Sequence, residues 1–393
     1  MDIINICLGV TGLREMTFPM VFMICIGLFL AFLAIVKKYE PLLLLPLSFG
    51  IIIANIPIAG LDAYTMYYNE AGELVRRGLL NFLYQGIIGV IYPPLIFLCI
   101  GTMTDFGPLI SSPRSALIGI GGQLGIFIAF GVSLWVSGLL SPFIAGFEAF
   151  SLKEAAAIGI IGSSDGPTAI YTATRLAPNI LPSVAIAAFS YMALVPFIQP
   201  PIMRLLTTAK ERVIVMPPPR TVTQRQKIIF PIAVVIVTLL LVPAAGALIS
   251  MLMLGNLIKE SGVAERYVRT LQNDVLNVLT LLVAVSIGSS ATAEFFLTPT
   301  TLVIIACGLL AFVFGTIGGI LIAKLLCWVT KGKVNPLIGN SGVSAMPMAA
   351  RISQKMGLKY NTQNHLLMHA MGPIVSSTIG SAVIAGIFIT IFK

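Results

Sequence analysis

Stretches of about twenty apolar residues recur along this chain and limit its fold more than any other feature. A helix needs about 20 such residues to cross the hydrocarbon core of a bilayer. Charged residues make up only 10% of the sequence and hydrophobic residues 57%, whereas soluble domains carry roughly a quarter charged residues. The sequence lacks the alternating segments of a membrane β-barrel. It therefore predicts an all-α, polytopic membrane protein.

One long polar segment, residues 205–227, interrupts this pattern. With the residue before it, the segment holds one acid, Glu211, against six basic residues: Arg204, Lys210, Arg212, Arg220, Arg225 and Lys227. The triple proline Pro217–Pro219 excludes a continuous helix. We expect a cytoplasmic linker between membrane halves 1–204 and 228–393, and we attribute the net charge of +9 to membrane anchoring rather than to nucleic-acid binding.

The two halves contain the same features in the same order: an apolar segment, a long span, an interrupted helix and a last span. The interrupted helices are "GSSDGPT" (162–168) and "NPLIGNSGVSAMPMAAR" (335–351). An offset of 177 residues aligns Gly162 with Gly339, Ser164 with Ser341, and Pro196 with Pro373. Identity is low, so the shared order is the stronger sign of a repeat. Paired, interrupted helices indicate a transporter-like site at the bilayer midplane.

The first interrupted helix carries a lone carboxylate, Asp165, among small and apolar residues. Gly162 and Gly166 break the helix, and Pro167 suits the first turn of the next one. Asp165 then lies at or beside an N-cap, with three hydroxyl groups near it in sequence: Ser163, Ser164 and Thr168. Carboxylate, hydroxyl and unwound carbonyl oxygens suit a small cation such as Na⁺. A plain N-cap is the alternative, but an ionisable residue inside a membrane favours a functional role.

The second interrupted helix offers neutral oxygens. Asn335 and Pro336 begin a short helical piece, "GNSG" (339–342) breaks it, and Ser344 precedes a turn that contains Pro347. The oxygen donors are Asn335, Asn340, Ser341 and Ser344. Caps and interhelical hydrogen bonds explain these residues as well as a ligand role does. Arg351 follows, either to hold an anion or as a snorkelling cation.

Other reactive residues give weaker patterns. His365 and His369 have helical i,i+4 spacing, but no carboxylate or cysteine completes a metal site. Tyr191 is typical of a packing or interface tyrosine, and Asp105 of a capping residue. Five cysteines show no metal or redox spacing: Cys7, Cys25, Cys99, Cys307 and Cys327. The apolar segment 18–36 is too long for a signal peptide, so we expect a retained first span.

Four segments together resemble one family. They are "YPPLIFLCIGTMTDFGPLI" (92–110), "GSSDGPTAIYTATRLAP" (162–178), "NPLIGNSGVSAMPMAARISQ" (335–354) and "LLMHAMGP" (366–373). They resemble the β subunit of the bacterial sodium-pumping, biotin-dependent decarboxylases of oxaloacetate, methylmalonyl-CoA and glutaconyl-CoA. The resemblance extends from about residue 15 to the C-terminus.

The resemblance implies a specific activity. In that family a carboxyltransferase α subunit moves CO₂ from the substrate to biotin on a carrier subunit. The β subunit then decarboxylates carboxybiotin, consumes a proton and drives Na⁺ out of the cell. The implied fold is elevator-transporter-like, with two inverted repeats divided between scaffold and core. The implied assembly is a homotrimeric β core with a small γ or δ subunit in the bacterial inner membrane, with biotin on the partner and not on this chain.

The resemblance also implies site residues. The catalytic set would be Asp165, Tyr191, Ser344 and Arg351, and the Na⁺ ligands Asp165, Asn335, Gly339 and Ser344. Asp165 would be the charged ligand, helped by carbonyls of residues 162–166. Ser344, with Asn335 and Tyr191, would build a second cation position or a proton path. Arg351 would attract the carboxylate of carboxybiotin.

The chain departs from the family pattern at two positions. Ser164 stands where the family commonly has alanine or glycine, and Ile374 where it commonly has asparagine. Ser164 would add a ligand oxygen, and Ile374 removes a polar group.

Two other classes of function explain part of the sequence. A Na⁺-coupled secondary transporter of an organic anion, with no decarboxylase partner, would also need broken helices and Asp165. A membrane scaffold would not need the carboxylate. Only the pump should associate with a biotinylated polypeptide.

Overall fold

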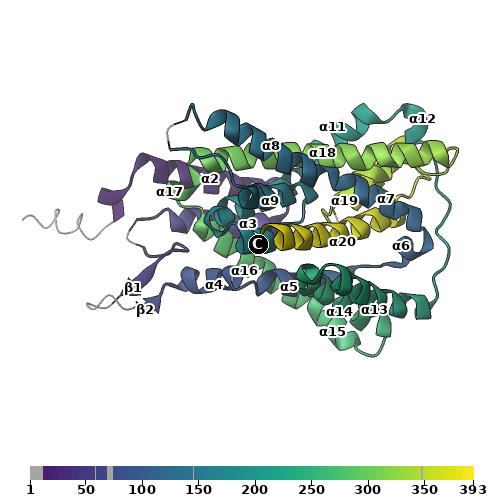
Figure 1. Cartoon of the computed structure of the whole chain (residues 1–393), viewed down its shortest axis with the longest axis horizontal. Helices are drawn as coiled ribbons and strands as arrows, with labels where there is room; N and C mark the ends of the chain where they lie inside the picture. The colour runs from purple at the N-terminus through teal and green to yellow at the C-terminus, as the bar shows by residue number, and fades with distance from the viewer. Residues whose placement is uncertain (1–11, 58, 69–73, 145, 347) are drawn as a thin grey trace, which may run out of the picture.

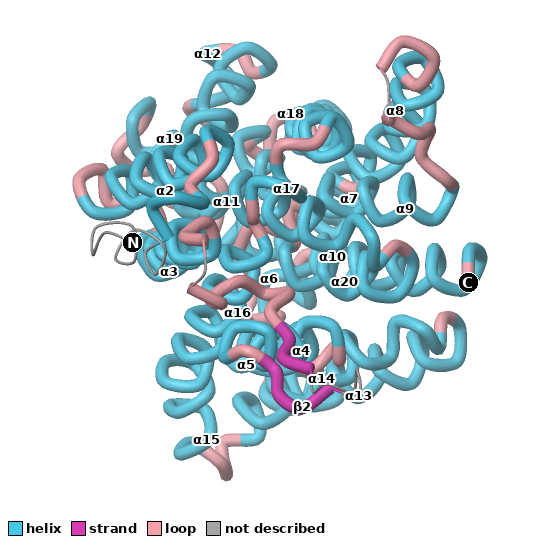
Figure 2. Tube along the Cα trace, turned by 90° about the vertical axis from the view of Figure 1, so that its left-hand side faces the viewer, coloured by secondary structure: helices cyan, strands magenta, loops and turns pink. Residues whose placement is uncertain are grey.

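The computed structural model describes residues 12–57, 59–68, 74–144, 146–346 and 348–393. Cys7 and Pro347, which the sequence singled out, lie outside the described residues. Helices dominate the described parts, and one antiparallel hairpin joins β1 (Met66–Tyr68) to β2 (Leu74–Arg77) through pairing of Met66 with Arg77 (Figure 2).

Among the described residues, six helical stretches are long and apolar enough to span a membrane, and up to eight if each of two bent pairs is one span. The six include α2 (Phe18–Ile35), α13 (Gln224–Leu241), α18 (Pro299–Val329) and α20 (Leu367–Phe392). The other two combine η2 (Pro113–Ser115), α7 (Ala116–Gly122) and α8 (Leu124–Leu140), and α15 (Glu265–Thr270), η6 (Leu271–Val275) and α16 (Leu276–Ser290). The prediction of a polytopic all-α membrane protein is confirmed.

The two bent pairs bend by more than 60°. One joins α4 (Leu79–Ile88) to α5 (Tyr92–Met103) at 68°, and the other lies within η4 (Pro178–Ile180) and α11 (Leu181–Leu206), at 61°. The remaining elements are shorter: η1 (Gly12–Glu15), α3 (Pro41–Ala54), α6 (Gly107–Ser111), α9 (Leu152–Ile160), η3 (Ile161–Ser163), α10 (Gly166–Leu176), α12 (Ala209–Arg212), η5 (Pro243–Ala245), α14 (Gly246–Ser261), α17 (Ala293–Phe296), η7 (Pro336–Gly342) and α19 (Met348–Tyr360).

Capping residues explain where several helices begin. Ser151 and Glu154 form a reciprocal capping box at the start of α9, and Thr223 with Gln226 does the same for α13. Thr298 caps α18, whose first residue is Pro299. The basic linker therefore ends where α13 begins, at Gln224.

Glycine contacts let two pairs of helices from different halves of the chain cross closely. A Cβ atom on Gly288 of α16 would lie 2.2 Å from the Leu47 carbonyl oxygen of α3. A Cβ atom on Gly101 of α5 would lie 2.0 Å from the Leu252 carbonyl oxygen of α14. Such contacts are typical of membrane helices, which associate by close backbone packing rather than by a hydrophobic effect.

The linker and the strand hairpin lie at opposite ends of the long axis (Figure 1). At the linker end, Lys324 Nζ of α18 donates to the Leu206 carbonyl oxygen at 2.9 Å and lies 3.6 Å from Glu211 Oε1. The first residues of α18 lie near the other end, beside α17 (Figure 1). This 31-residue helix is roughly 46 Å long. Its two ends serve as reference points for the positions of the interrupted helices along the long axis.

Candidate functional site

The first interrupted helix is a hairpin whose two ends lie together. Asn179 Nδ2, just after α10, donates to Glu154 Oε1 at the start of α9 at 2.6 Å. Both residues line a pocket with Thr298 and Thr301, at the start of α18. The chain thus enters from the end of the molecule that is away from the linker, turns at residues 161–165, and returns.

The second interrupted helix has both ends at the linker. At its start, Asn335 Nδ2 donates to the carbonyl oxygens of Arg212 (3.2 Å) and Ile214 (2.8 Å). Its Oδ1 accepts from the Leu337 amide at 2.9 Å and so caps η7. After α19, Asn364 Nδ2 donates to the same Arg212 carbonyl oxygen at 3.0 Å. This segment therefore enters from the opposite end of α18.

The two segments meet at their turns. The Ser344 amide donates to the Ser163 carbonyl oxygen at 2.8 Å. Glycines allow both segments to pack closely against neighbouring helices: a Cβ atom on Gly162 would lie 2.6 Å from the Gly125 carbonyl oxygen of α8. One on Gly339 would lie 2.7 Å from the Gly319 carbonyl oxygen of α18. Two breaks from distant parts of the sequence thus form one site.

Asp165 lies at this meeting point and caps α10. It is 6% exposed. Its Oδ2 accepts hydrogen bonds from Thr168 Oγ1 at 2.7 Å and from Ser381 Oγ of α20 at 2.9 Å, and the Thr168 amide lies 3.5 Å from Oδ1. The break forms because Ser164 adopts a left-handed conformation (φ 57°), which turns the chain into the new helix. The cap that the sequence predicted is present, and it lies inside the molecule rather than at its surface.

The carboxylate has hydroxyl partners but no cationic side chain. No salt bridge between described residues involves Asp165. Hydrogen bonds to a charged group contribute about 1.5–3 kcal/mol each, whereas burying an isolated carboxylate costs far more. Two hydroxyl groups therefore leave most of that cost unmet, and a small bound cation would supply the missing charge.

A second polar cluster adjoins the carboxylate through α20. Ser344 Oγ and Ser377 Oγ are 2.9 Å apart, and Gln123 Nε2 donates to Ser377 Oγ at 2.7 Å. Ser377 and Ser381 are one turn apart, so α20 joins this cluster to Asp165. Two buried oxygens at the site, Ser164 Oγ and Gln123 Oε1, have no hydrogen-bond partner among the described residues. Oxygens without partners can serve as cation ligands.

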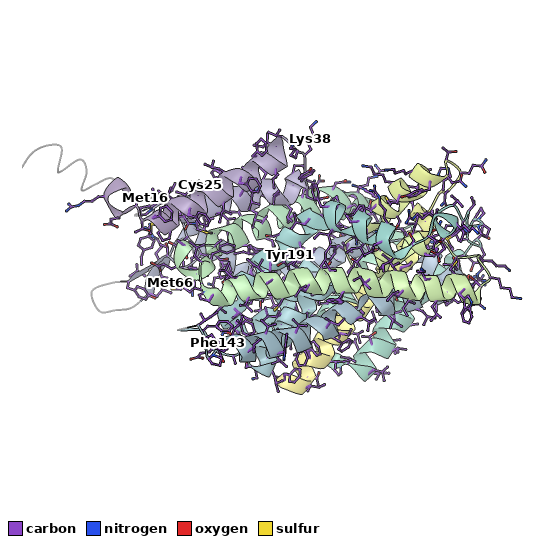
Figure 3. The ribbon with its side chains drawn as sticks, turned by 90° about the horizontal axis from the view of Figure 1, so that it is seen from above. Met16, Cys25, Lys38, Met66, Phe143 and Tyr191 are labelled. Atoms are coloured by element: carbon purple, nitrogen blue, oxygen red, sulfur yellow. The ribbon has the colours of Figure 1, made fainter. Side chains whose placement is uncertain are left out.

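The structure brings Asp165 and Ser344 together, but it does not gather the other four predicted site residues around them. Gly339 packs against α18, and the Asn335 side chain donates a hydrogen bond to a backbone carbonyl oxygen of the linker. The Tyr191 hydroxyl donates to the Ile305 carbonyl oxygen of α18, and Figure 3 shows Tyr191 beside that long helix.

Arg351 is exposed on α19 and lines a separate pocket with Lys38 and Glu40. Burial raises the pKa of Glu40, and the Arg351 guanidinium group partly offsets that rise. Arg351 therefore already interacts with an acidic side chain of this chain.

Three residues of the site were not predicted: Gln123, Ser377 and Ser381. The available signal was the run "SSTIGS" (376–381), which places small hydroxyl groups on an apolar span just after Pro373. On its own this run is also typical of helices that pack through small residues.

Comparison with known proteins decides the family. Residues 19–392 match the family described as "Na+-transporting oxaloacetate decarboxylase beta subunit". The chain belongs to this family. The methylmalonyl-CoA decarboxylase subunit beta of Propionigenium modestum is 47% identical over 399 residues, which cover 97% of each chain. The oxaloacetate decarboxylase beta chain 2 of Salmonella typhi is 44% identical over 99% of each chain.

A glutaconyl-CoA decarboxylase subunit beta, from Acidaminococcus fermentans, is 46% identical over 96% of this chain and 94% of its own length. The predicted family is therefore confirmed, and this Na⁺-transporting decarboxylase β subunit is a multi-pass membrane component of a multi-subunit decarboxylase. Decarboxylation is coupled to Na⁺ translocation in this family. A secondary transporter without a decarboxylase is not favoured.

Proposed function

We propose that this β subunit decarboxylates carboxybiotin on a partner carrier subunit and drives Na⁺ out of the cell, with Asp165 as the charged Na⁺ ligand. The observation that carries the proposal is the buried Asp165 carboxylate, which has hydroxyl partners and no cationic side chain where the two interrupted helices meet. Asp165 belongs to the same segment that the family resemblance singled out.

The oxygens around Asp165 suit Na⁺. The hydroxyl groups of Thr168 and Ser381 keep lone pairs while they donate to the carboxylate. Ser164 Oγ has no hydrogen-bond partner in the part of the chain that the structure describes, and carbonyls of the 162–166 break add further oxygens. The family resemblance implies a second cation position or proton path at Ser344, with Asn335 and Tyr191. We propose that Ser377 and Gln123, which adjoin Ser344, take part in it.

The coupling follows from charge balance. Decarboxylation breaks the N–C bond of carboxybiotin, releases CO₂, and leaves the ring nitrogen to take a proton. That proton and Na⁺ compete for the Asp165 carboxylate, so each state of the site carries one or the other. The proton thereby reaches the cytoplasmic side while Na⁺ leaves on the other.

The architecture supports two inverted repeats with elevator-like motion. The hairpin of α9 and α10 has its ends away from the linker, and the η7–α19 segment has its ends at the linker. In the packed pairs α3–α16 and α5–α14, one helix comes from the half before residues 205–227 and the other from the half after them. A core that holds the interrupted helices would move against this scaffold.

The remaining roles are also proposals. Tyr191, Asn335 and Gly339 would support the cation path, the first two by hydrogen bonds and Gly339 by close packing. Biotin would be carried by a partner subunit, and the complex would include a carboxyltransferase α subunit, a small γ or δ subunit and a homotrimeric β core. The membrane would be the bacterial inner membrane, with the linker in the cytoplasm.

The proposal is tested by ²²Na⁺ uptake into proteoliposomes that contain the intact decarboxylase complex. We expect uptake only when a carboxylated substrate of the complex is added. Asp165→Asn should abolish uptake and Na⁺-dependent CO₂ release, because the variant has no charge to exchange. Uptake without substrate would favour a secondary transporter, and full activity of Asp165→Asn would reject the ligand assignment.

A further inference from the structure

A cavity of about 270 Å³ lies at the linker end of the molecule. The α6–η2–α7 segment forms one wall, the last turns of α18 another, and Pro217–Pro219 of the linker lie across it. Figure 1 shows the linker running along this end, past α6. Since the triple proline cannot form a helix, the linker stays extended over the cavity.

The charged side chains that line this cavity are all basic. They are Arg114, Arg220 and Lys333. No salt bridge between described residues involves any of the three. Arg220 makes a long contact, from Nη2 to the Ile110 carbonyl oxygen at 3.5 Å. All three residues are exposed, so their charges face solvent at the cavity. Three cations that share a cavity lined by no acid are suited to bind an anion, and arginine is well suited to carboxylates.

The rest of the lining limits what kind of anion this is. Apolar side chains, among them Leu326 and Ile338, lie beside hydroxyl groups such as Ser112 and Thr330. The cavity volume lies just below the range of small-molecule sites, roughly 300–1,000 Å³. A small, partly apolar head group with one carboxylate fits these features better than a nucleotide or an acyl-CoA does.

The cavity shares two elements with the cation site. Val334 and Ile338 both line the cavity. Val334 precedes η7 and Ile338 lies within it, and η7 leads to Ser344. His369 lines it from α20, eight residues or roughly 12 Å before Ser377. A ligand in the cavity would thus contact the elements that hold the polar cluster.

We propose that this cavity binds the carboxylated head group of biotin, an anionic cyclic urea, with Arg114, Lys333 and Arg220 around its carboxylate. This inference rests on the proposed function, because it gives a place to the substrate named there. It locates that substrate at the linker end, away from the pocket in which Arg351 interacts with Glu40.

The test measures the affinity of the intact complex for its biotin carrier in carboxylated and uncarboxylated form. The complex carries Asp165→Asn, so that carboxybiotin is not consumed. Arg114→Gln and Lys333→Gln should each lower the affinity for the carboxylated carrier about tenfold, by loss of a charged hydrogen bond. The affinity for the uncarboxylated carrier should not change, and Arg114→Lys and Lys333→Arg should recover part of the loss.

Lys331→Gln is the matched control, because Lys331 is exposed two residues away and does not line the cavity. The inference is overturned if Lys333→Gln behaves like Lys331→Gln, or if only Arg351→Gln removes the preference for the carboxylated carrier. It is also overturned if the cavity variants lose co-purified anionic phospholipid instead, which would make it a lipid head-group site.

Failure of this inference can be told apart from failure of the proposed function. In wild-type complex, substrate-driven ²²Na⁺ uptake reports the pump whether or not the cavity holds the head group. Pumping with no effect of the cavity variants rejects the cavity alone. Absence of pumping rejects the proposed function, while the carrier-affinity comparison still reports on the cavity.

Discussion

At Asp165, two hydroxyl groups stand where a cationic side chain would stand in an ordinary buried ion pair. Thr168 comes from the same helix start, and Ser381 comes from α20, so the geometry depends on packing between distant segments. A hydroxyl group can donate to a carboxylate and can also ligate a cation. Lysine and arginine donate to carboxylates but have no acceptor atom with which to ligate a cation. In the proposed cycle, hydroxyl groups in place of a cationic side chain would keep the carboxylate available for exchange between a proton and Na⁺.

Ser381→Ala tests this use of a hydroxyl group. Loss of Oγ removes one hydrogen bond to the carboxylate and one proposed Na⁺ ligand, so we expect the Na⁺ concentration for half-maximal decarboxylation to rise about tenfold. Thr390→Ala is the control, because Thr390 Oγ1 bonds only its own helix, at the Gly386 carbonyl oxygen (2.8 Å). Equal Na⁺ dependence in the two variants would remove Ser381 from the site.

Among the elements, the broken helices depend on glycine contacts that leave no room for a side chain. A Cβ atom on Gly122 of α7 would lie 1.7 Å from the Gly342 carbonyl oxygen. Gly131 of α8 meets nothing within 4 Å. Gly122 and Gly131 are nine residues apart. Comparing alanine substitutions at the two positions therefore distinguishes the effect of close packing from that of helix propensity.

Gly122→Ala should lower stability, since the backbone of η7 must shift, at a cost of about 1–3 kcal/mol. Gly131→Ala should be neutral or stabilising by up to about 1 kcal/mol, because alanine is the better helix former. Thermal unfolding of the purified complex in detergent measures both. A Gly122→Ala chain as stable as Gly131→Ala would show that the segments do not pack this closely.

The sequence predicts the broken helices because their causes are local: each interrupted segment combines glycines with a proline, and Pro167 and Pro336 favour the start of a helical piece. The predicted break points are wrong, because Gly162 lies within η3 and Gly339 within η7, and these pieces end at Ser163 and Gly342. It also predicts that Asp165 is a functional residue, because burying a carboxylate among apolar residues is costly unless the carboxylate has a role. It does not predict Ser381 or Gln123 as partners, since an uncharged polar residue on a span has no distinct pattern. Nor does it predict that Asn335 bonds the linker, because that contact joins residues more than 120 positions apart.

At the scale of the whole molecule, hydrogen bonds and close contacts divide the helices into two groups. The α3–α16 and α5–α14 crossings form one group, and the interrupted helices with α7, α8 and α18 form the other. Few polar contacts between described residues join the groups; Tyr171 of α10 donates to the Ala244 carbonyl oxygen at 3.1 Å, and Thr104 Oγ1 lies 3.6 Å from Met346 Sδ. Such an interface suits sliding of one group past the other.

A reversible cross-link between the groups tests whether that sliding carries Na⁺. In Thr104→Cys/Met346→Cys, a short thiol-specific cross-linker should stop substrate-driven ²²Na⁺ uptake, and reduction should restore it. Ser183→Cys/Thr301→Cys is the control, because these side chains are 2.7 Å apart and join α11 to α18 at the start of that helix, within the proposed moving core. Cross-linking there should leave uptake intact, and the cysteine-containing parent chain corrects for labelling elsewhere. If both cross-links stop uptake equally, or if neither does, a core that moves as a rigid unit against its scaffold is ruled out.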